Sequence, residues 1–229
     1  MPQFSRHVTL FHSPQSRSTG VLALLEEIGA DYDLHFLNAK NGEQRRHEYL
    51  SINPMGKVPA ILHDGSLVTE QGAVYVYLAD LYGDAELAPA IDDPLRGSYL
   101  RWFFFYGSSF EPAIVDRSMK RQAAPLSMSP YGDYETMFGT VQQQLAKGPF
   151  FLGANFTALD LLWGTALRWT TRFELVPESN VVGDYIERIV ARPAVKRAES
   201  IDDELMKRCD DASRTHMAPG SAQGSSAPT

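Results

Sequence analysis

The sequence predicts an α/β domain followed by an all-α domain. Over the first third of the chain, short β-branched and aromatic segments alternate with helical patterns. Residues 84–93 contain Pro89 and two adjacent aspartates, which favours a linker. From residue 94 onward the apolar spacing is helical and no convincing strand appears. We therefore place an α/β domain at 1–83, a linker at 84–93 and a helical domain at 94–211.

The N-terminal segments follow one another as a crossover unit, a hairpin and a covering helix. Gly29 is typical of the residue that ends a helix, and Asp64-Gly65 is typical of a hairpin turn. In chain order we expect a strand at 8–11, a helix at 21–28, a strand at 31–37, a short helix at 45–50, a hairpin over 58–69 and a helix at 71–82.

The helical half begins with an aromatic face. Its side chains recur at helical spacing and are Tyr99, Trp102, Phe103, Tyr106 and Phe110. Further helices are expected at 133–145, 158–172, 182–192 and 194–209. The residues after Asp211 are mostly Ser, Ala, Gly, Pro and Thr, which predicts a disordered tail over 212–229.

The helix at 158–172 has the best-defined start. Thr157 stands at its N-cap and Asp160 three residues on, which is a capping box. Phe156 and Leu161 stand at the positions of a hydrophobic staple. We interpret this device as structural.

Composition excludes several classes of function. A net charge of −7 over 229 residues, with no basic half, argues against a nucleic-acid partner. The sequence has no run of eighteen apolar residues, so we expect no membrane span. Residues 1–7 lack the apolar region of a secretory signal. The six histidines are scattered, so we expect no metal site, and the single cysteine, Cys209, fits a reducing, cytoplasmic location.

Three features carry candidate chemistry, and each has a structural alternative. The turn at 12–18 precedes a helix, where serine hydroxyls and N–H groups can hold an anion such as a thiolate; Ser16 or Ser18 could instead simply cap the helix. The peptide bond before Pro59 is a candidate cis peptide, and the backbone beside it could pair with an extended, peptide-like ligand. Alternatively, Pro59 is an ordinary proline of an edge strand. Glu70 and Gln71 begin a helix, where they suit the α-amino and α-carboxylate groups of a ligand, or again cap it.

Together these residues resemble the cytosolic glutathione transferase family, most closely its unclassified bacterial members related to the beta and theta classes. The resemblance covers residues 8 to about 208 and rests on the Ser-Pro-x-Ser-Arg-Ser turn, Leu25–Gly29, Asn53-Pro54-x-Gly56-Lys57-Val58-Pro59, Thr69-Glu70 and Phe156–Asp160. It implies a thioredoxin-like N-terminal domain, an all-α C-terminal domain and a homodimer.

The resemblance also implies roles for individual residues. Val58 would pair with the cysteinyl part of glutathione beside a cis Pro59, Glu70 and Gln71 would hold the γ-glutamyl end, and Lys57 would reach the glycyl carboxylate. Gln71 departs from the serine usual in the family. For thiol activation, the beta-class pattern places Arg17 where that class carries its cysteine, and the theta-like pattern selects Ser13. Neither selects Ser16, which lies nearest the expected helix start, so Ser13 and Ser16 are joint candidates, with Arg17 and Ser18 as neighbours.

The implied function is a glutathione transferase whose thiolate attacks a hydrophobic electrophile on the helical domain. The aromatic face and nearby side chains supply the candidate contacts: Tyr106, Phe110, Trp102, Trp169, Tyr99 and Met119. Most of that face is expected to be core. Glutathione-dependent peroxide reduction and a non-catalytic binding scaffold are the alternatives. The turn at 12–18 holds no cysteine, so a mixed disulfide with glutathione is excluded there.

Overall fold

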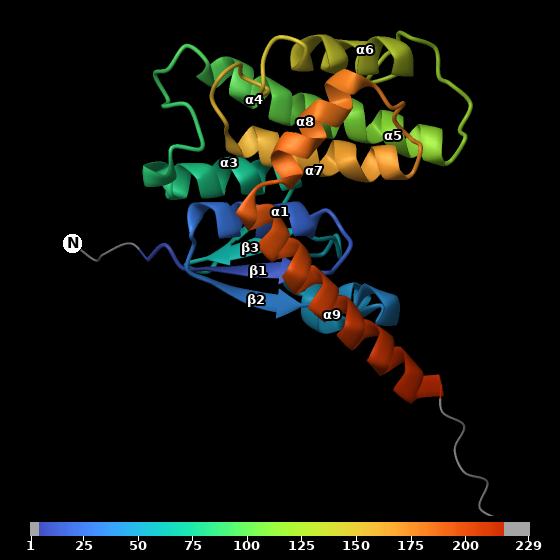
Figure 1. Ribbon diagram of the computed structural model, residues 1–229. Coiled ribbons are helices and arrows are strands. Elements are labelled where there is room, and N and C mark those ends of the chain that lie inside the picture. Colours follow the sequence, from blue (N-terminus) through green and yellow to red (C-terminus); the bar gives the residue numbers. More distant parts are fainter. Residues whose placement is uncertain (1–4, 218–229) are drawn as a thin grey trace, which may run out of the picture.

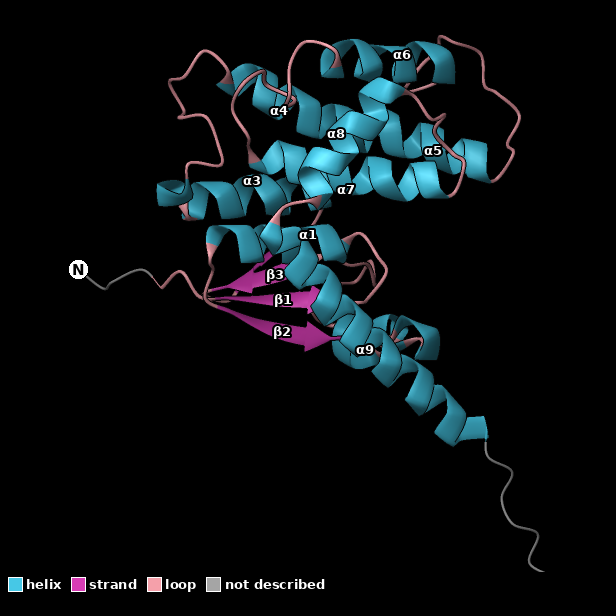
Figure 2. Ribbon diagram, viewed as in Figure 1, coloured by secondary structure: helices cyan, strands magenta, loops and turns pink. Residues whose placement is uncertain are grey.

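A four-stranded sheet in the order β2-β1-β3-β4 forms the N-terminal domain (Figures 1 and 2). The computed structural model describes residues 5–217. Strands β1 (Val8–His12) and β2 (Tyr32–Phe36) pair in parallel and are connected by helix α1 (Ser18–Ile28). Strand β3 (Ala60–His63) pairs antiparallel with β1, and β4 (Ser66–Val68) pairs antiparallel with β3. This is the predicted crossover unit followed by a hairpin, and it confirms the thioredoxin-like α/β domain.

Local sequence signals set the ends of these elements. Helix α1 stops at Gly29, whose φ of 63° is readily adopted only by glycine. The β3–β4 turn uses Asp64 and Gly65 at φ values of 47° and 78°, as a tight hairpin turn requires. The predicted short helix at 45–50 is α2 (His47–Leu50), and it follows two short 3-10 turns, Ala39–Asn41 and Glu43–Arg45.

Helices α1 and α3 (Gln71–Leu81) lie between the sheet and the helical domain (Figure 1). Their apolar faces are buried with the inner strands, so that Leu22 and Leu25 of α1 and Leu10 of β1 are fully excluded from solvent. On the other side both helices contact α7 (Ala158–Arg172). The domains therefore share one core, and the chemistry-bearing turn before α1 lies beside their junction.

The helical domain departs from prediction at the aromatic face. A single helix was expected, but α4 (Arg96–Phe105) passes through a π-helical turn, Tyr106–Phe110, into α5 (Glu111–Ser118). Pro112 has no N–H group, so it cannot donate to the Ser108 carbonyl as a residue of a regular α-helix would. The Glu111 N–H donates to the Tyr106 carbonyl, five residues back, which is the hydrogen bond of a π-helical turn. The five aromatic side chains nevertheless all face the core, as their spacing indicated.

The remaining helices are α6 (Tyr134–Leu145), α8 (Asn180–Val190) and α9 (Pro193–Met217). The predicted capping box of α7 is present: the Thr157 N–H donates to the Asp160 carboxylate at 2.9 Å, and Asp160 is fully buried. No helix in the described part of the chain is both long and apolar enough to cross a bilayer.

Helix α9 returns from the helical domain and runs along α1 toward the end of the sheet (Figure 1). Arg197 on α9 pairs with Glu26 on α1, with Nε and Oε2 2.7 Å apart. The predicted helix at 194–209 and tail from 212 need correction, because α9 continues to Met217. Extending an existing helix costs far less than starting one, so a weakly apolar segment can follow it. Residues 218–229 lie outside the described part of the chain.

Candidate functional site

The turn between β1 and α1 gathers three serines around one carbonyl group. The Ser13 carbonyl oxygen lies 2.6 Å from Ser16 Oγ and 3.1 Å from Ser18 Oγ, within hydrogen-bond distance of both hydroxyls. The two hydroxyl oxygens are themselves 2.7 Å apart. Ser16 Oγ also accepts from the Ser18 N–H at 3.2 Å, at the start of α1. Ser16, one of the two candidates for thiol activation, therefore also accepts from the first N–H group of α1.

The segment before β3 carries the predicted cis peptide, between Val58 and Pro59. The Lys57 carbonyl accepts from Tyr49 Oη at 2.6 Å and from Asn53 Nδ2 at 2.9 Å, while the Lys57 side chain is exposed. The main chain of Val58 makes no hydrogen bond with other residues that the structure describes. Its N–H and C=O groups are therefore available to an extended ligand.

Glu70 immediately precedes α3 with a φ of 64° and a ψ of 117°. Residues other than glycine rarely adopt positive φ, and holding one there stores strain that is typical of functional sites. The Glu70 side chain is exposed at the positive end of α3. The neighbouring Gln71 donates from Nε2 to the Arg17 carbonyl at 3.1 Å, and its buried Oε1 has no partner among the described residues.

These three features meet at one end of the sheet. Phe11 pairs with Ala60 across β1 and β3, which brings the cis proline next to the serine turn. The Gln71 hydrogen bond to Arg17 brings the start of α3 to the same turn. Segments separated by up to about sixty residues therefore form one contiguous surface.

A cavity of about 80 Å³ opens beside this surface, between the two domains. The N-terminal domain lines it with Gln15, Ser16, Arg17, Gly20 and Gln71, and the helical domain with Tyr106, Glu111, Thr165, Ala166, Trp169 and Thr170. Five predicted site residues thus come together here: Ser16, Arg17, Gln71, Tyr106 and Trp169. Ser13, Ser18, Lys57, Val58, Pro59 and Glu70 lie outside the cavity lining.

An ion pair joins the two walls of the cavity. Arg17 Nε donates to Glu111 Oε1 at 2.6 Å, and a second bond links Arg17 Nη2 to Glu111 Oε2. Glu111 raises the pKa of the Arg17 guanidinium, whose Cζ lies 5.6 Å from the centre of the Trp169 ring. Tyr106 Oη also donates to Glu111. Burial, followed by the Glu111 charge, raises the pKa of Tyr106 well above its usual value, so this hydroxyl is a donor and not a base.

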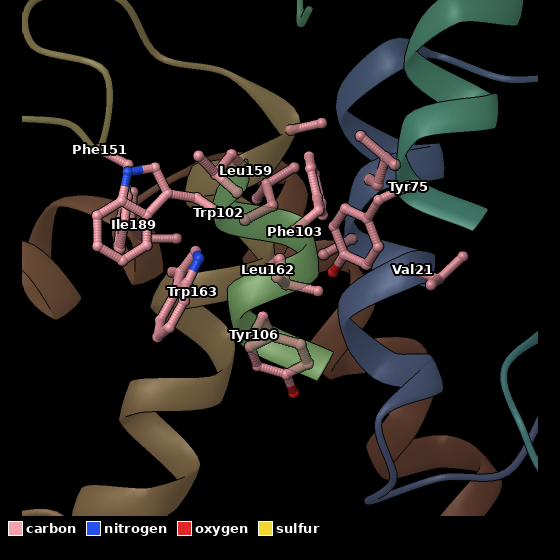
Figure 3. Close-up of a cluster of buried hydrophobic side chains, with 14 of the residues drawn as sticks. Val21, Tyr75, Trp102, Phe103, Tyr106, Phe151, Leu159, Leu162, Trp163 and Ile189 are labelled. Carbon is pink, nitrogen blue, oxygen red and sulfur yellow. The ribbon is translucent and has the colours of Figure 1, made fainter. Parts of the chain in front are cut away.

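Some of the candidate substrate contacts line the cavity, and most of the others belong to the hydrophobic core. Figure 3 shows the Tyr106 hydroxyl directed away from the aromatic cluster of Trp102, Phe151 and Trp163. Trp102 packs edge-on against Trp163, with ring centres 6.1 Å apart, and Phe110 packs against the same ring at 5.0 Å. Tyr99, Trp102 and Phe110 are therefore core, while Met119 is exposed at the end of α5 and does not line the cavity.

Sequence reasoning missed two buried residues behind the serine turn. His12, the last residue of β1, is fully buried between Ser18 and Asp202 of α9. Its Nδ1 lies 2.9 Å from Ser18 Oγ, and its Nε2 lies 3.0 Å from Asp202 Oδ1. No local pattern connects positions 12 and 202, because the contact depends on the path of α9. Glu111 was missed for the same reason.

Among the described residues, no group of three or more His, Cys, Asp or Glu side chains is arranged to hold a metal ion.

An α/β domain with a cis-proline edge, facing an all-helical domain across a cavity, is the architecture of the two-domain glutathione transferases. Residues 6–80 match the family model of the glutathione S-transferase N-terminal domain. Glutathione S-transferase APIC of Nicotiana tabacum is 30% identical over 205 residues, covering 82% of this chain and 96% of its own. The chain belongs to the glutathione S-transferase family.

Two further relatives extend this comparison. Disulfide-bond oxidoreductase YfcG of Escherichia coli K12 is 27% identical, covering 83% of this chain and 94% of its own. The solved structure of a sphingomonad glutathione S-transferase, in complex with glutathione, is 27% identical with a TM-score of 0.69, covering 85% of this chain and 98% of its own.

Proposed function

We propose that this protein is a glutathione transferase that ionises the thiol of bound glutathione and directs the thiolate at an electrophile in the cavity between its domains. The observation that carries this proposal is the meeting of the serine turn, the Val58 backbone and Glu70 at one end of the sheet. The complex of the sphingomonad relative with glutathione supports the same ligand.

Each part of glutathione has a complementary group on this surface. The cysteinyl backbone would pair with the N–H and C=O groups of Val58 beside Pro59. The γ-glutamyl ammonium would meet the Glu70 carboxylate, with Gln71 and the N–H groups of α3 on the adjoining carboxylate. Lys57 would reach the glycyl carboxylate. In this arrangement the thiol would point toward Ser13 and Ser16.

Ser13→Ala and Ser16→Ala separate the two candidates for thiol activation. Loss of a hydrogen bond to a charged group costs about 1.5–3 kcal/mol, which corresponds to roughly one to two pH units in the bound thiol. We expect the larger upward shift for Ser16→Ala, because Ser16 lines the cavity and Ser13 does not. Thiolate absorbance of the binary complex, titrated against pH, measures both. If neither variant shifts the curve, Ser18, Arg17 or the backbone must stabilise the thiolate.

The electrophile would contact the exposed face of Trp169 and the hydroxyl of Tyr106, with Thr165 and Thr170 beside them. Phe110 and Trp163 would fix the Tyr106 ring from the core side, with ring centres 5.6 Å and 5.4 Å from its own, and Trp102 packs against Trp163 behind them. The small volume and the many polar groups of the cavity favour a compact electrophile over a large flat one. A homodimer, a cytoplasmic location and a role in detoxification stay predictions.

A disulfide or a peroxide is the second candidate electrophile. The name of the Escherichia coli relative favours a disulfide. A bound glutathione thiolate can attack either substrate without a protein cysteine. Turnover of an aryl halide, an organic peroxide and a glutathione mixed disulfide by the purified chain distinguishes these reactions, and absence of turnover and of glutathione binding would leave only the scaffold interpretation.

Cys209→Ser should leave all three activities unchanged. Cys209 lies buried on α9 and does not line the cavity, and burial raises the pKa of its thiol, which disfavours the reactive thiolate. The comparison is kcat/KM of the variant and the wild type on each substrate. A selective loss of disulfide reduction would show that the protein thiol takes part.

A further inference from the structure

The His12 side chain is held between the fully buried Ser18 hydroxyl and the largely buried Asp202 carboxylate. Ser18 Oγ lies 2.9 Å from its Nδ1, and Asp202 Oδ1 lies 3.0 Å from its Nε2. Asp202 also accepts from Thr19 Oγ1 at 2.9 Å and from the Gln15 N–H at 2.7 Å. The Nε2 contact is bent away from the ideal hydrogen-bond direction, and Nε2 has no other partner among the described residues.

This surrounding fixes the tautomer of the neutral ring. Both oxygens of Asp202 act as acceptors, toward Thr19 and Gln15, so a neutral His12 is favoured with its proton on Nε2, which faces these oxygens, over the tautomer that presents a lone pair to them. Nδ1 is then an acceptor, and Ser18 must donate to it. Ser18 Oγ in turn accepts from the Ser13 N–H at 3.2 Å and from Ser16 Oγ at 2.7 Å.

The hydrogen-bond role of Ser18 also determines that of Ser16, which lines the cavity. With Ser18 donating to His12, the Ser16 hydrogen points inward, either to Ser18 Oγ at 2.7 Å or to the Ser13 carbonyl at 2.6 Å. Ser16 then presents a lone pair to the cavity and is a hydrogen-bond acceptor there. A thiol meets such an acceptor through its proton, whereas a thiolate needs a donor.

We propose that Asp202, His12, Ser18 and Ser16 form a buried relay that takes the thiol proton from glutathione and converts Ser16 from an acceptor into a donor. The S–H proton passes to Ser16 Oγ, the Ser16 proton to Ser18 Oγ, and the Ser18 proton to His12 Nδ1. One S–H bond is broken and one N–H bond is formed, which leaves a thiolate and an imidazolium. The proton later returns along the same hydroxyls to solvent or to the leaving group.

The charges around His12 suit this role. Asp202 on α9 is the only charged side chain found in contact with His12 in the described residues, and it stabilises the imidazolium. The nearest cation of the turn, Arg17, is directed to Glu111 across the cavity, so it does not oppose a positive charge on His12. Ser16 touches the thiol, while Ser18, His12 and Asp202 act through it as positioning residues.

The relay rests on the proposed glutathione site, and its test uses the thiolate absorbance of the glutathione complex. His12→Asn keeps a polar atom near Ser18 but cannot take a proton, Asp202→Asn removes the stabilising charge, and Ser18→Ala breaks the chain with the smallest change in volume. Each should raise the apparent pKa of the bound thiol by about one to two units. Turnover at neutral pH should fall roughly ten- to a hundredfold and approach that of the wild type at high pH, where the thiol ionises unaided.

Asp160→Asn is the matched control, because it likewise removes the charge of a buried carboxylate but lies outside the relay. It should lower the melting temperature and leave the thiol pKa unchanged. If Ser18→Ala and Asp202→Asn bind glutathione and titrate like the wild type, the relay is wrong and the proposed function stands. If the wild type itself binds no glutathione, both are wrong. Ser18→Ala decides the matter if His12→Asn does not fold.

Discussion

Asp160→Ala should lower the free energy of unfolding by about 3–5 kcal/mol, because it leaves several buried donors without an acceptor. The carboxylate accepts from the Phe151 N–H at 2.7 Å, from the Thr157 N–H at 2.9 Å and from Tyr185 Oη at 2.9 Å. It therefore joins the start of α7 to the preceding loop and to α8. Burial raises the pKa of Asp160, and these hydrogen bonds act in the opposite direction. Denaturant unfolding measures the change.

The control is Asp133→Ala at the start of α6. Asp133 is the N-cap residue of α6, and its Oδ1 accepts from the Thr136 N–H at 2.7 Å. It lies nearer the surface than Asp160, and its hydrogen bonds among the described residues stay within the first turn of α6. Its loss should cost about 1 kcal/mol, the usual value of a helix cap. Equal effects of the two variants would mean that Asp160 acts only as a cap.

Glu70→Gly should separate ligand binding from stability. It removes the carboxylate proposed to hold the γ-glutamyl ammonium, so the Kd for glutathione should rise roughly ten- to a hundredfold, the equivalent of about 1.5–3 kcal/mol. It also removes the side chain from a residue held at a φ of 64°. The melting temperature should therefore stay level or rise, since glycine tolerates positive φ.

Glu48→Ala is the matched control for Glu70, because Glu48 is an exposed carboxylate in the first turn of α2. It should change neither the Kd nor the melting temperature. Isothermal titration calorimetry with glutathione measures the binding of all three proteins. Unchanged affinity in Glu70→Gly would remove Glu70 from the site.

Many elements of the fold could be predicted because their signals are local. Gly29 ends α1 and Asp64-Gly65 closes the hairpin, since both need backbone conformations that few residues adopt. The limits of α7 match the prediction at both ends, because a capping box defines its start. The π-helical turn at Tyr106–Phe110 was not predicted, since the aromatic spacing fits a continuous helix and the effect of Pro112 on the preceding turn is not visible in that spacing.

The candidate site shows the same division. Ser16, Val58 and Glu70 could be nominated from the sequence because each stands in a short motif next to a strand or helix end, where backbone groups or helix dipoles create binding chemistry. The Arg17–Glu111 pair and the His12–Asp202 contact join positions 94 and 190 residues apart. Such contacts exist only once α5 and α9 have packed against the N-terminal domain. Neighbouring residues determine the backbone conformation of turns and helix ends, whereas the path of the whole chain determines which side chains meet a buried charged group.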